Sequence, residues 1–374
     1  MPSRNSLSSQ QLDAVPPAPH HLGVRQTAVR FARRRLALPR STLHLPLLLA
    51  VACSAGDGAG APIDAHRTAR DLQAVAATLD APVLAALLRA RPAIDAALGN
   101  RTLGLTVDLL LPIVAAAPGG ATPAARARLA SSARRQPSLD LPLPAATGPF
   151  EGVTFALAPD GRRYVPTSRR GAPVTGARFL LHGRGAARPE LGWVDVVREP
   201  GEDGGLFLSV HGDGATWLEC RLARVPQAGG AALELAGSAL GEAGRLDFAV
   251  TVERSDATRG TERVTRRLAL EARDLALSWT VTGDPVAGSR ALDLALGGRG
   301  GTLLVAGHST AGGGRYDAMA NGEPWALVEL REAGASMRRP DGTGLDAAER
   351  AVLLGLLESI GGAVVSPRPS TAAS

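Results

Sequence analysis

The side chains that most often carry out enzyme chemistry are sparse in this sequence. Three of its histidines, His182, His211 and His308, are far apart, and no His-x-x-x-His or Cys-x-x-Cys pair brings two metal ligands together. All 41 basic residues are arginines, so the chain has no lysine for a phosphate-binding loop or a Schiff base. The sequence therefore predicts no metal, no cofactor and no catalytic constellation, and we expect a protein that is not an enzyme.

One serine stands in a motif that resembles a catalytic one. The run Gly307-His308-Ser309-Thr310-Ala311-Gly312 resembles the nucleophile turn of the α/β-hydrolases, in which Gly-x-Ser-x-Gly follows a strand and opens a helix. Here Ala311 takes the place of the second glycine, residues 314–323 favour a hairpin over a helix, and no histidine follows the serine. An exported hydrolase is therefore disfavoured, and we expect a Gly-rich loop between two strands.

The two cysteines are interpreted differently. Cys220 alternates with Leu218 and Leu222, which predicts a small core residue with no partner that would make it a nucleophile. If Cys53 carries lipid, Cys220 has no intramolecular disulfide partner. Stability must then come from a hydrophobic core.

An arginine-rich block precedes an acid-rich block in the middle of the chain. No acid lies between Asp160 and Glu190, and acids predominate from Glu190 to Glu219. If successive strands are neighbours, the two blocks neutralise each other across the sheet. The functional alternative is an anion-binding patch for lipid headgroups or an envelope polymer. Its candidate residues are Arg162, Arg163, Arg169, Arg170 and Arg178.

The basic character of the chain is confined to its N-terminus. The net charge of +6 sits within residues 1–53, and the rest of the sequence is neutral. Residues 33–53 contain an arginine cluster, then a short apolar run, then small residues before Cys53. This order resembles a bacterial lipoprotein signal, in which the cysteine becomes the acylated first residue, although Leu49 stands one place further from Cys53 than is usual in that family.

The resemblance to a lipoprotein signal implies lipid attachment at Cys53 and a flexible tether at 54–63. The protein is then expected to be exported and anchored in the bacterial cell envelope, facing the periplasm or the cell surface, with the choice of inner or outer membrane open. A secretory signal cleaved nearby and a buried apolar segment are the alternatives. The long stretch before the arginines suggests that translation starts later, near Val29. Export and a neutral mature chain argue against nucleic acid as a partner.

Residues 148–335 are predicted to form an antiparallel β domain. Leu246–Val252 and Leu275–Val281 alternate apolar and polar residues, which is typical of strands with one buried face. Hairpin turns are expected at Asp160-Gly161, Asp213-Gly214 and Asn321-Gly322. The predicted fold class is α+β, mainly β: a long antiparallel meander that forms a curved sheet or partial barrel.

Helices are expected on both sides of this domain in the sequence. Residues 64–135 are Ala-rich, with helix starts at Asp64 and at Asp80 with Pro82, and a Pro-rich linker follows at 136–147. A C-terminal helix is predicted within 341–362, where Asp346 and Glu349 have capping-box spacing, and 363–374 should be a disordered tail. This last helix should cover one face or end of the sheet.

The motifs Arg163-Tyr164-Val165, Gly171-Ala172-Pro173, Gly176-Ala177-Arg178-Phe179 and Gly192-Trp193-Val194-Asp195 resemble a group of uncharacterised exported bacterial β-rich, lipoprotein-like proteins. That resemblance implies an architecture and no activity. The leading hypothesis is a non-enzymatic, lipid-anchored envelope protein whose β domain has a structural or binding role. The alternative is a half-barrel lipid or lipoprotein carrier that holds an acyl chain between sheet and helices.

Overall fold

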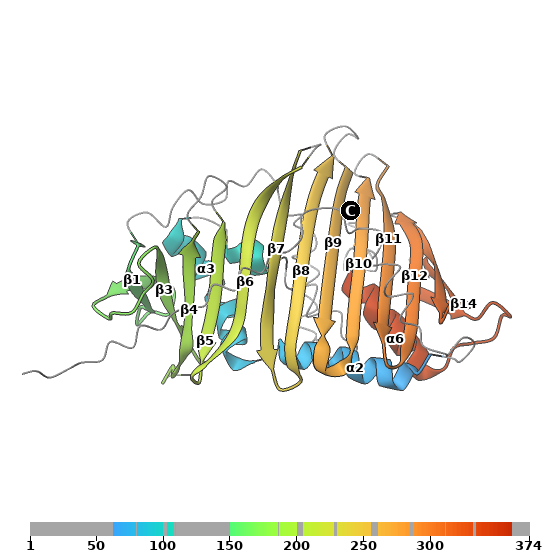
Figure 1. Cartoon of the computed structure of the whole chain (residues 1–374), viewed down its shortest axis with the longest axis horizontal. Coiled ribbons are helices and arrows are strands. Elements are labelled where there is room, and N and C mark those ends of the chain that lie inside the picture. Colours follow the sequence, from blue (N-terminus) through green and yellow to red (C-terminus); the bar gives the residue numbers. More distant parts are fainter. Residues whose placement is uncertain are drawn as a thin grey trace, which may run out of the picture. The chain divides into compact units, whose positions relative to one another are not determined.

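The computed structural model describes a long open sheet with helices at one of its faces (Figure 1). The described residues are 63–79, 81–99, 103–107, 109, 150–185, 187–199, 205–227, 230–255, 261–284, 287–310, 312–331 and 334–360. All of them belong to one compact unit, Leu45–Ser374. The predicted signal with Cys53, the tether up to residue 62, the linker 136–147 and the tail 363–374 lie outside the described residues.

Fifteen described strands form one sheet that does not close. They are β1 (Val153–Leu157), β2 (Tyr164–Thr167), β3 (Gly176–His182), β4 (Glu190–Arg198), β5 (Leu206–Gly212), β6 (Ala215–Gln227), β7 (Gly230–Gly241), β8 (Gly244–Ser255), β9 (Thr261–Leu270), β10 (Leu275–Asp284), β11 (Ser289–Gly298), β12 (Gly301–Thr310), β13 (Gly313–Ala320), β14 (Glu323–Arg331) and β15 (Gly334–Arg338). From β3 to β15, each strand pairs antiparallel with the next. The predicted mainly β meander is therefore confirmed.

One pairing departs from the predicted antiparallel pattern. β3 lies beside β1 and runs parallel to it, so the sheet ends in the order β3-β1-β2. Pro166 within β2 has no backbone N–H to offer a further strand, which suits β2 to the edge of the sheet. The chain consequently crosses back and adds β3 on the free side of β1.

Two further differences concern glycine-rich segments. The Gly-rich loop expected at Gly307–Gly312 is wrong for most of its length, because β12 continues through Ser309 to Thr310 and β13 begins at Gly313. Ser309 therefore lies within a regular strand and not on a strained turn. Strand β15, rich in small and exposed residues, has no apolar alternation and was not predicted. The hairpin turns are confirmed, since Asp213 and Asn321 adopt positive φ angles of 50° and 51° before a glycine.

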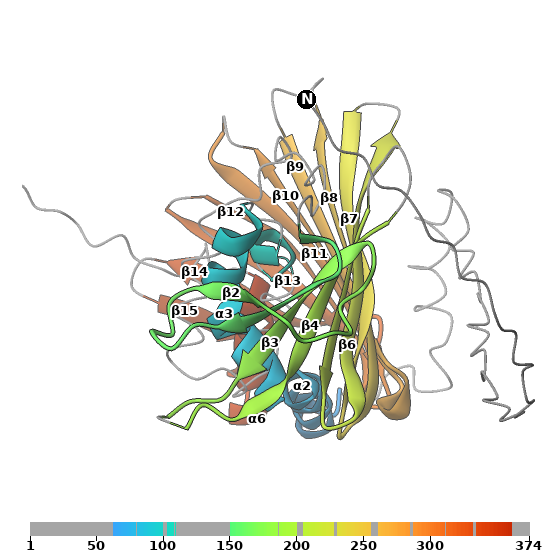
Figure 2. The ribbon, with the colours of Figure 1, turned by 90° about the vertical axis from the view of Figure 1, so that its left-hand side faces the viewer.

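The inner face of the sheet is the one whose side chains share a single hydrophobic core with the helices. In β8, Leu246, Phe248, Val250 and Val252 are all at most 4% exposed, as the alternation predicted. Figure 2 shows the sheet edge-on, curved, with the helices on one side of it. Burial of this continuous apolar face is the main source of stability for the unit.

Two N-terminal helices and one C-terminal helix pack at the inner face. They are α2 (Ala65–Thr78), α3 (Pro82–Leu98) and α6 (Ala347–Ile360). Asp64 caps α2 by accepting a hydrogen bond of 2.9 Å from the amide of Arg67, and its own amide binds the carbonyl of Gly300 in the β11–β12 turn. α2 thereby lies along the ends of the strands. Further along the Ala-rich region 64–135, residues 103–107 and 109 are also helical, and residues 110–135 lie outside the described residues.

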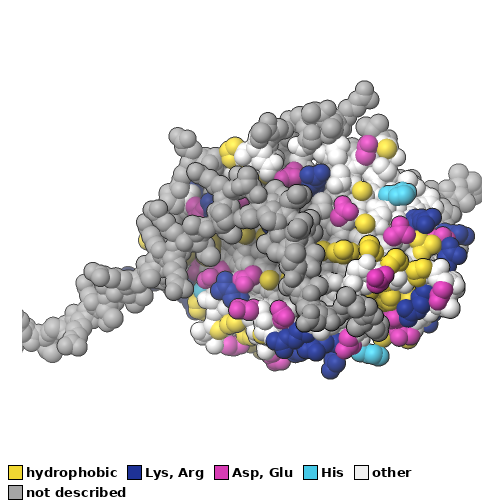
Figure 3. All heavy atoms as spheres, turned by 45° about the vertical axis from the view of Figure 1, so that its right-hand side comes forward, with side chains coloured by type: hydrophobic (Ala, Val, Ile, Leu, Met, Phe, Trp, Pro, Cys, Tyr) yellow, Lys and Arg dark blue, Asp and Glu magenta, His cyan; other side chains and the backbone are white. Residues whose placement is uncertain are grey.

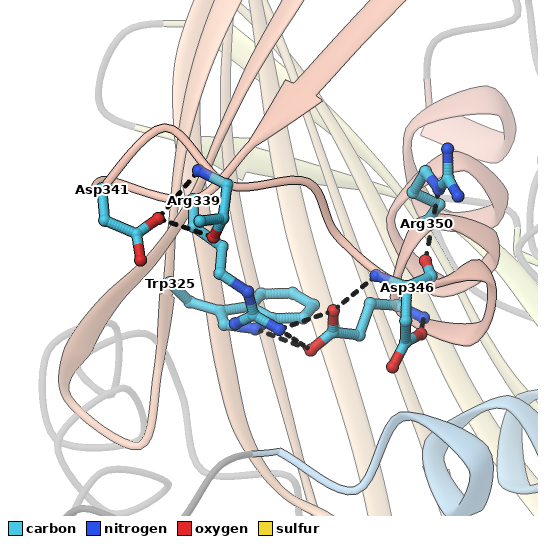
Figure 4. A network of polar contacts seen from close by, with 7 residues as sticks. Trp325, Arg339, Asp341, Asp346 and Arg350 are labelled. Atoms are coloured by element: carbon cyan, nitrogen blue, oxygen red, sulfur yellow. Dashed lines mark hydrogen bonds and ion pairs between the residues drawn. The ribbon is translucent and has the colours of Figure 1, made fainter.

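A compact polar network fixes the start of α6 (Figure 4). The amide of Glu349 donates to Asp346 and the amide of Asp346 donates to Glu349, at 2.8 and 2.9 Å, which is the predicted capping box. Arg339 donates two hydrogen bonds to the same Glu349 carboxylate, and Trp325 of β14 donates a third at 3.4 Å. Val352, Leu353 and Leu356 are fully buried in the shared core, and α6 also packs against α2.

Among the described helices, none is long and apolar enough to cross a membrane by itself. Only α2 and α3 taken together pass such a test, across a bend of 58°.

Candidate functional site

Charged and polar side chains form one row across the inner face, near the strand ends opposite α2. Strand pairing places one position from each of six neighbouring strands in this row. We call it the inner polar row; it consists of Arg254 (β8), Glu262 (β9), Gly283 (β10), Arg290 (β11), Ser309 (β12) and Gly314 (β13). Neighbouring strands are about 4.8 Å apart, so the backbones of Glu262 and Arg290 are separated by about 10 Å across Gly283.

A fourth charged residue lies deeper on the same face. Arg266 is four residues along β9 from Glu262, in phase with Val264, Leu268 and Leu270 of the core. Its cross-strand partners are Val250 in β8 and Trp279 in β10, both at most 1% exposed. A guanidinium group has therefore been placed among apolar side chains.

Two hydrogen-bond donors in this part of the core have no acceptor. The guanidinium carbon of Arg266 lies 5.9 Å from the centroid of the Trp279 ring, within the range of a cation–π contact. Within the described part of the chain, Nε of Arg266 and Nε1 of Trp279 are buried without any hydrogen-bond partner. A buried donor left unpaired costs about 1–3 kcal/mol, so two adjacent ones require an explanation.

Burial opposes the charges of Arg266 and Glu262 at this site. Burial lowers the pKa of Arg266 to about 10, against the raising effect of Glu262. Burial also raises the pKa of Glu262, although the positive charges of Arg254, Arg290 and Arg266 partly oppose that rise. The three arginines therefore lie close enough to Glu262 to act on it, and together they exceed its single negative charge.

Two glycines on the inner face, Gly283 and Gly307, differ in how closely other atoms surround them. A Cβ added at Gly283 would have no heavy atom of a described residue within 4 Å, so the described side chains leave the inner face open between Glu262 and Arg290. A Cβ at Gly307 would lie 2.7 Å from the ring of Tyr316, which covers that position. Burial raises the pKa of Tyr316, while a hydrogen bond from Ser309 and the charge of Arg290 partly lower it.

This arrangement can hold an anion. Arg266 and Trp279 present unused N–H groups, Arg290 forms no ion pair with any described residue, and Gly283 leaves room beside it. Val264 and Val281 lie between these groups and are only partly buried. The site therefore combines a cationic, donor-rich part with an adjacent apolar surface.

A second network, on the opposite face, resembles a catalytic triad only in composition. Ser209 and Asp195 both approach the same nitrogen of His211, Nε2, at 3.0 and 3.9 Å, and Thr216 contacts Nδ1 at 3.1 Å. In a triad the serine and the acid bind opposite ring nitrogens. Asp195 is instead held by Arg178 through two hydrogen bonds of 2.7 and 2.8 Å.

Stacking completes this outer-face network as a structural unit. The ring of Trp193 stacks on His211 with centroids 5.1 Å apart, and the guanidinium of Arg178 lies 4.7 Å above Trp193. The pKa of His211 is lowered, first by burial, with Asp195 acting in the raising direction. A neutral imidazole hydrogen-bonded to two hydroxyls stabilises the β4–β6 part of the sheet.

The arginine block is only partly available for anions. Arg178 binds Asp195 across neighbouring strands, as the cross-strand hypothesis expected. Arg169, which follows β2, binds Glu190 of the non-adjacent β4 at 2.6 Å, and Arg163 contacts Asp160 at 3.6 Å. Arg162 and Arg170 are exposed on the same part of the surface.

Over the β14 end of the molecule, acidic and basic side chains are interspersed with apolar ones (Figure 3).

The remaining predicted positions do not converge. Cys220 is 1% exposed in the core, where burial raises its thiol pKa to about 12, so the core assignment is confirmed. His308 is exposed on β12. His182 is the last residue of β3 and lies beside a groove of about 690 Å³ that it forms with Pro159 and Arg188. Within the described ranges, no three His, Cys, Asp or Glu side chains are grouped so that they could hold a metal ion.

No family model matches this chain, and no curated protein or solved structure is significantly similar to it.

Proposed function

We propose that this protein is a non-enzymatic, lipid-anchored protein of the bacterial cell envelope whose β domain binds a ligand on its inner face. The observation that carries the binding role is the pair of buried, unpartnered donors on Arg266 and Trp279. A purely structural core would gain stability by replacing Arg266 with an apolar residue. A ligand that accepts these hydrogen bonds gives the arginine a reason to be there.

The anchoring part of the proposal rests on the sequence before the β domain. The arginines, the short apolar run and the small residues before Cys53 support acylation at that cysteine. The exposed Arg162 and Arg170 would then face anionic headgroups or envelope polymers as an additional, salt-sensitive contact. Both roles keep the protein at the membrane surface in the periplasm or outside the cell.

A second candidate function is transport of lipid or lipoprotein by the same domain. It is favoured by the open, curved sheet with helices at its apolar inner face. Because Val352 and Leu353 of α6 are fully buried in the core, a carried acyl chain would have to lie near the inner polar row and not under α6. The carrier function additionally requires release to a second membrane or protein.

Mass spectrometry of the protein purified from its own cells tests the proposal. Under denaturing conditions, we expect the Cys53 peptide to carry acyl groups and to begin the mature chain, with a Cys53→Ala variant as the unmodified control. Under native conditions, we expect an additional non-covalent ligand mass. An unmodified Cys53 within an intact N-terminus would contradict the anchor, and a ligand-free protein that binds no lipid in solution would contradict the binding role.

A further inference from the structure

We propose that the inner polar row, together with Arg266 and Trp279, recognises the single negative charge of an acyl-chain amphiphile with an oxyacid head group. This inference rests on the proposed binding function and specifies the ligand. It follows from the balance of charges, the unused donors and the apolar surface beside them.

The charge balance selects a monoanion. Arg254, Arg266 and Arg290 act on the charge of Glu262 from β8, β9 and β11. Even with Arg254 left out of the count because it has further interactions of its own, Arg266 and Arg290 exceed Glu262 by one positive charge. An ionised carboxylate or phosphodiester brought to this place would neutralise that excess, whereas a neutral ligand would leave it uncompensated in a partly buried site.

The donor geometry selects an oxygen acceptor near β9 and β10. Arg266 and Trp279 are direct cross-strand partners, so their side chains leave the sheet next to each other. One oxygen of a head group can accept from both unpaired N–H groups. Hydrogen bonds from a guanidinium to an oxyanion are about twice as strong as bonds between neutral groups, so this contact offsets part of the cost of burying the head group.

The apolar residues beside the charged groups favour a ligand with an acyl chain over a small free anion. Val264 and Val281 are neighbours in the row between Arg266 and the inner polar row, and both remain partly exposed. Gly283 leaves open space above the adjacent backbone. An acyl chain lying over these residues removes apolar surface from water, which acetate or inorganic phosphate cannot do.

Fluorescence titration of the delipidated full-length protein with a dansyl-labelled fatty acid, and with its neutral methyl ester, tests this inference. We expect the acid to bind at least tenfold more tightly than the ester, because one charge-assisted hydrogen bond is worth about a factor of ten or more. Arg266→Met and Arg290→Gln should weaken binding of the acid about tenfold or more and leave binding of the ester nearly unchanged. Arg263→Gln, an exposed arginine on the opposite face of β9, is the matched control and should behave as wild type.

The opposite change in charge gives a second, independent readout. Glu262→Gln removes the only carboxylate that competes with the head group in this row, so the acid should bind more tightly to this variant. Circular dichroism of each variant shows whether it is folded, and Glu262→Gln keeps the test decisive if an arginine variant fails to fold.

The outcomes separate the inference from the proposed function. Equal affinity for acid and ester would overturn head-group recognition while leaving a lipid-binding domain. Competition by acetate or phosphate as strong as that by the fatty acid would overturn the amphiphile and leave a simple anion site. If neither probe binds, and the native protein carries no ligand, then both the inference and the binding function are wrong.

Discussion

Arg266 on β9 and Trp279 on β10 are direct cross-strand partners, and each holds a buried side-chain nitrogen with no hydrogen-bond partner among the described residues. The residues on either side of this pair across the sheet, Val250 of β8 and Leu294 of β11, are apolar. An isolated guanidinium in such a place lowers stability. We interpret the pair as a binding site that the fold maintains at some cost in stability.

Glu262 should make stability depend on pH in a direction opposite to most carboxylates. Its pKa is raised in the folded protein, mainly by burial and against the charges of Arg254, Arg266 and Arg290, so ionisation opposes folding. The penalty is absent below the unfolded pKa and grows as the pH rises through the folded pKa. Glu262→Gln should therefore unfold at the same urea concentration as wild type near pH 3 and at a higher one at pH 7. A variant less stable than wild type at pH 7 would contradict this.

Two glycines on the inner face should respond oppositely to the same substitution. Gly283→Val places a β-branched side chain in open space on a strand, which should stabilise the fold by about 0.5–1 kcal/mol. It should also obstruct the proposed ligand. Gly307→Val would place its Cβ in a clash with the backbone carbonyl oxygen of Arg315 and 2.7 Å from the ring of Tyr316, and should destabilise by about 1–3 kcal/mol or more. Thermal unfolding of the two variants side by side measures the difference, and equal effects would contradict the described packing.

The carboxylate of Glu349 should be worth more than a helix cap alone. It accepts hydrogen bonds from Arg339, from Trp325 and from the amide of Asp346, while being 5% exposed. Glu349→Ala should cost about 2–4 kcal/mol, because it removes the cap and leaves Arg339 without its partner. Glu323→Ala, at an exposed position of β14, serves as the control and should change the free energy of unfolding by less than about 0.5 kcal/mol. Similar losses in both variants would argue against the network.

Two ion pairs of the arginine block, one cross-strand and one outside the strand pairing, should differ in strength. Arg178 and Asp195 are mostly buried, so Asp195→Asn should cost about 2–4 kcal/mol by leaving a guanidinium unpaired against Trp193. Arg169 and Glu190 form an exposed pair, and Arg169→Gln should cost less than about 1 kcal/mol. Chemical denaturation resolves this contrast. A reversed order would mean that burial does not govern the energies of these pairs.

Much of the architecture follows from local pattern. Alternation in β8 and β10, the Asx-Gly turns and the capping box of α6 each depend on residues close together in the sequence, and the structure confirms them. The parallel pairing of β1 with β3 could not be predicted from local sequence pattern, because it depends on which edge of β1 remains free after β2 has paired. Strand β12 is also longer than its apolar residues alone predict, because pairing with β11 and β13 extends the strand through Gly307.

The candidate site escaped sequence reasoning for a different reason. Arg266 stands in phase with Val264 and Leu268, which was a usable signal, because a charge on the apolar side of an alternating strand must be buried or bound. Glu262 and Arg290 give no such signal by themselves. They face each other only because β9, β10 and β11 pair in one register, and that register is a property of the whole sheet.

Thermal unfolding of Arg266→Met, with and without a saturating fatty acid, tests the central claim most directly. Burial lowers the pKa of Arg266 to about 10, so below that pH its charge opposes folding, and the apolar variant should be more stable than wild type by about 1–3 kcal/mol without ligand. The fatty acid should raise the melting temperature of wild type and of the Arg263→Gln control by clearly more than that of Arg266→Met, which binds it more weakly. A variant that is less stable than wild type and gains as much from the fatty acid would show that Arg266 is structural, and the account would be wrong.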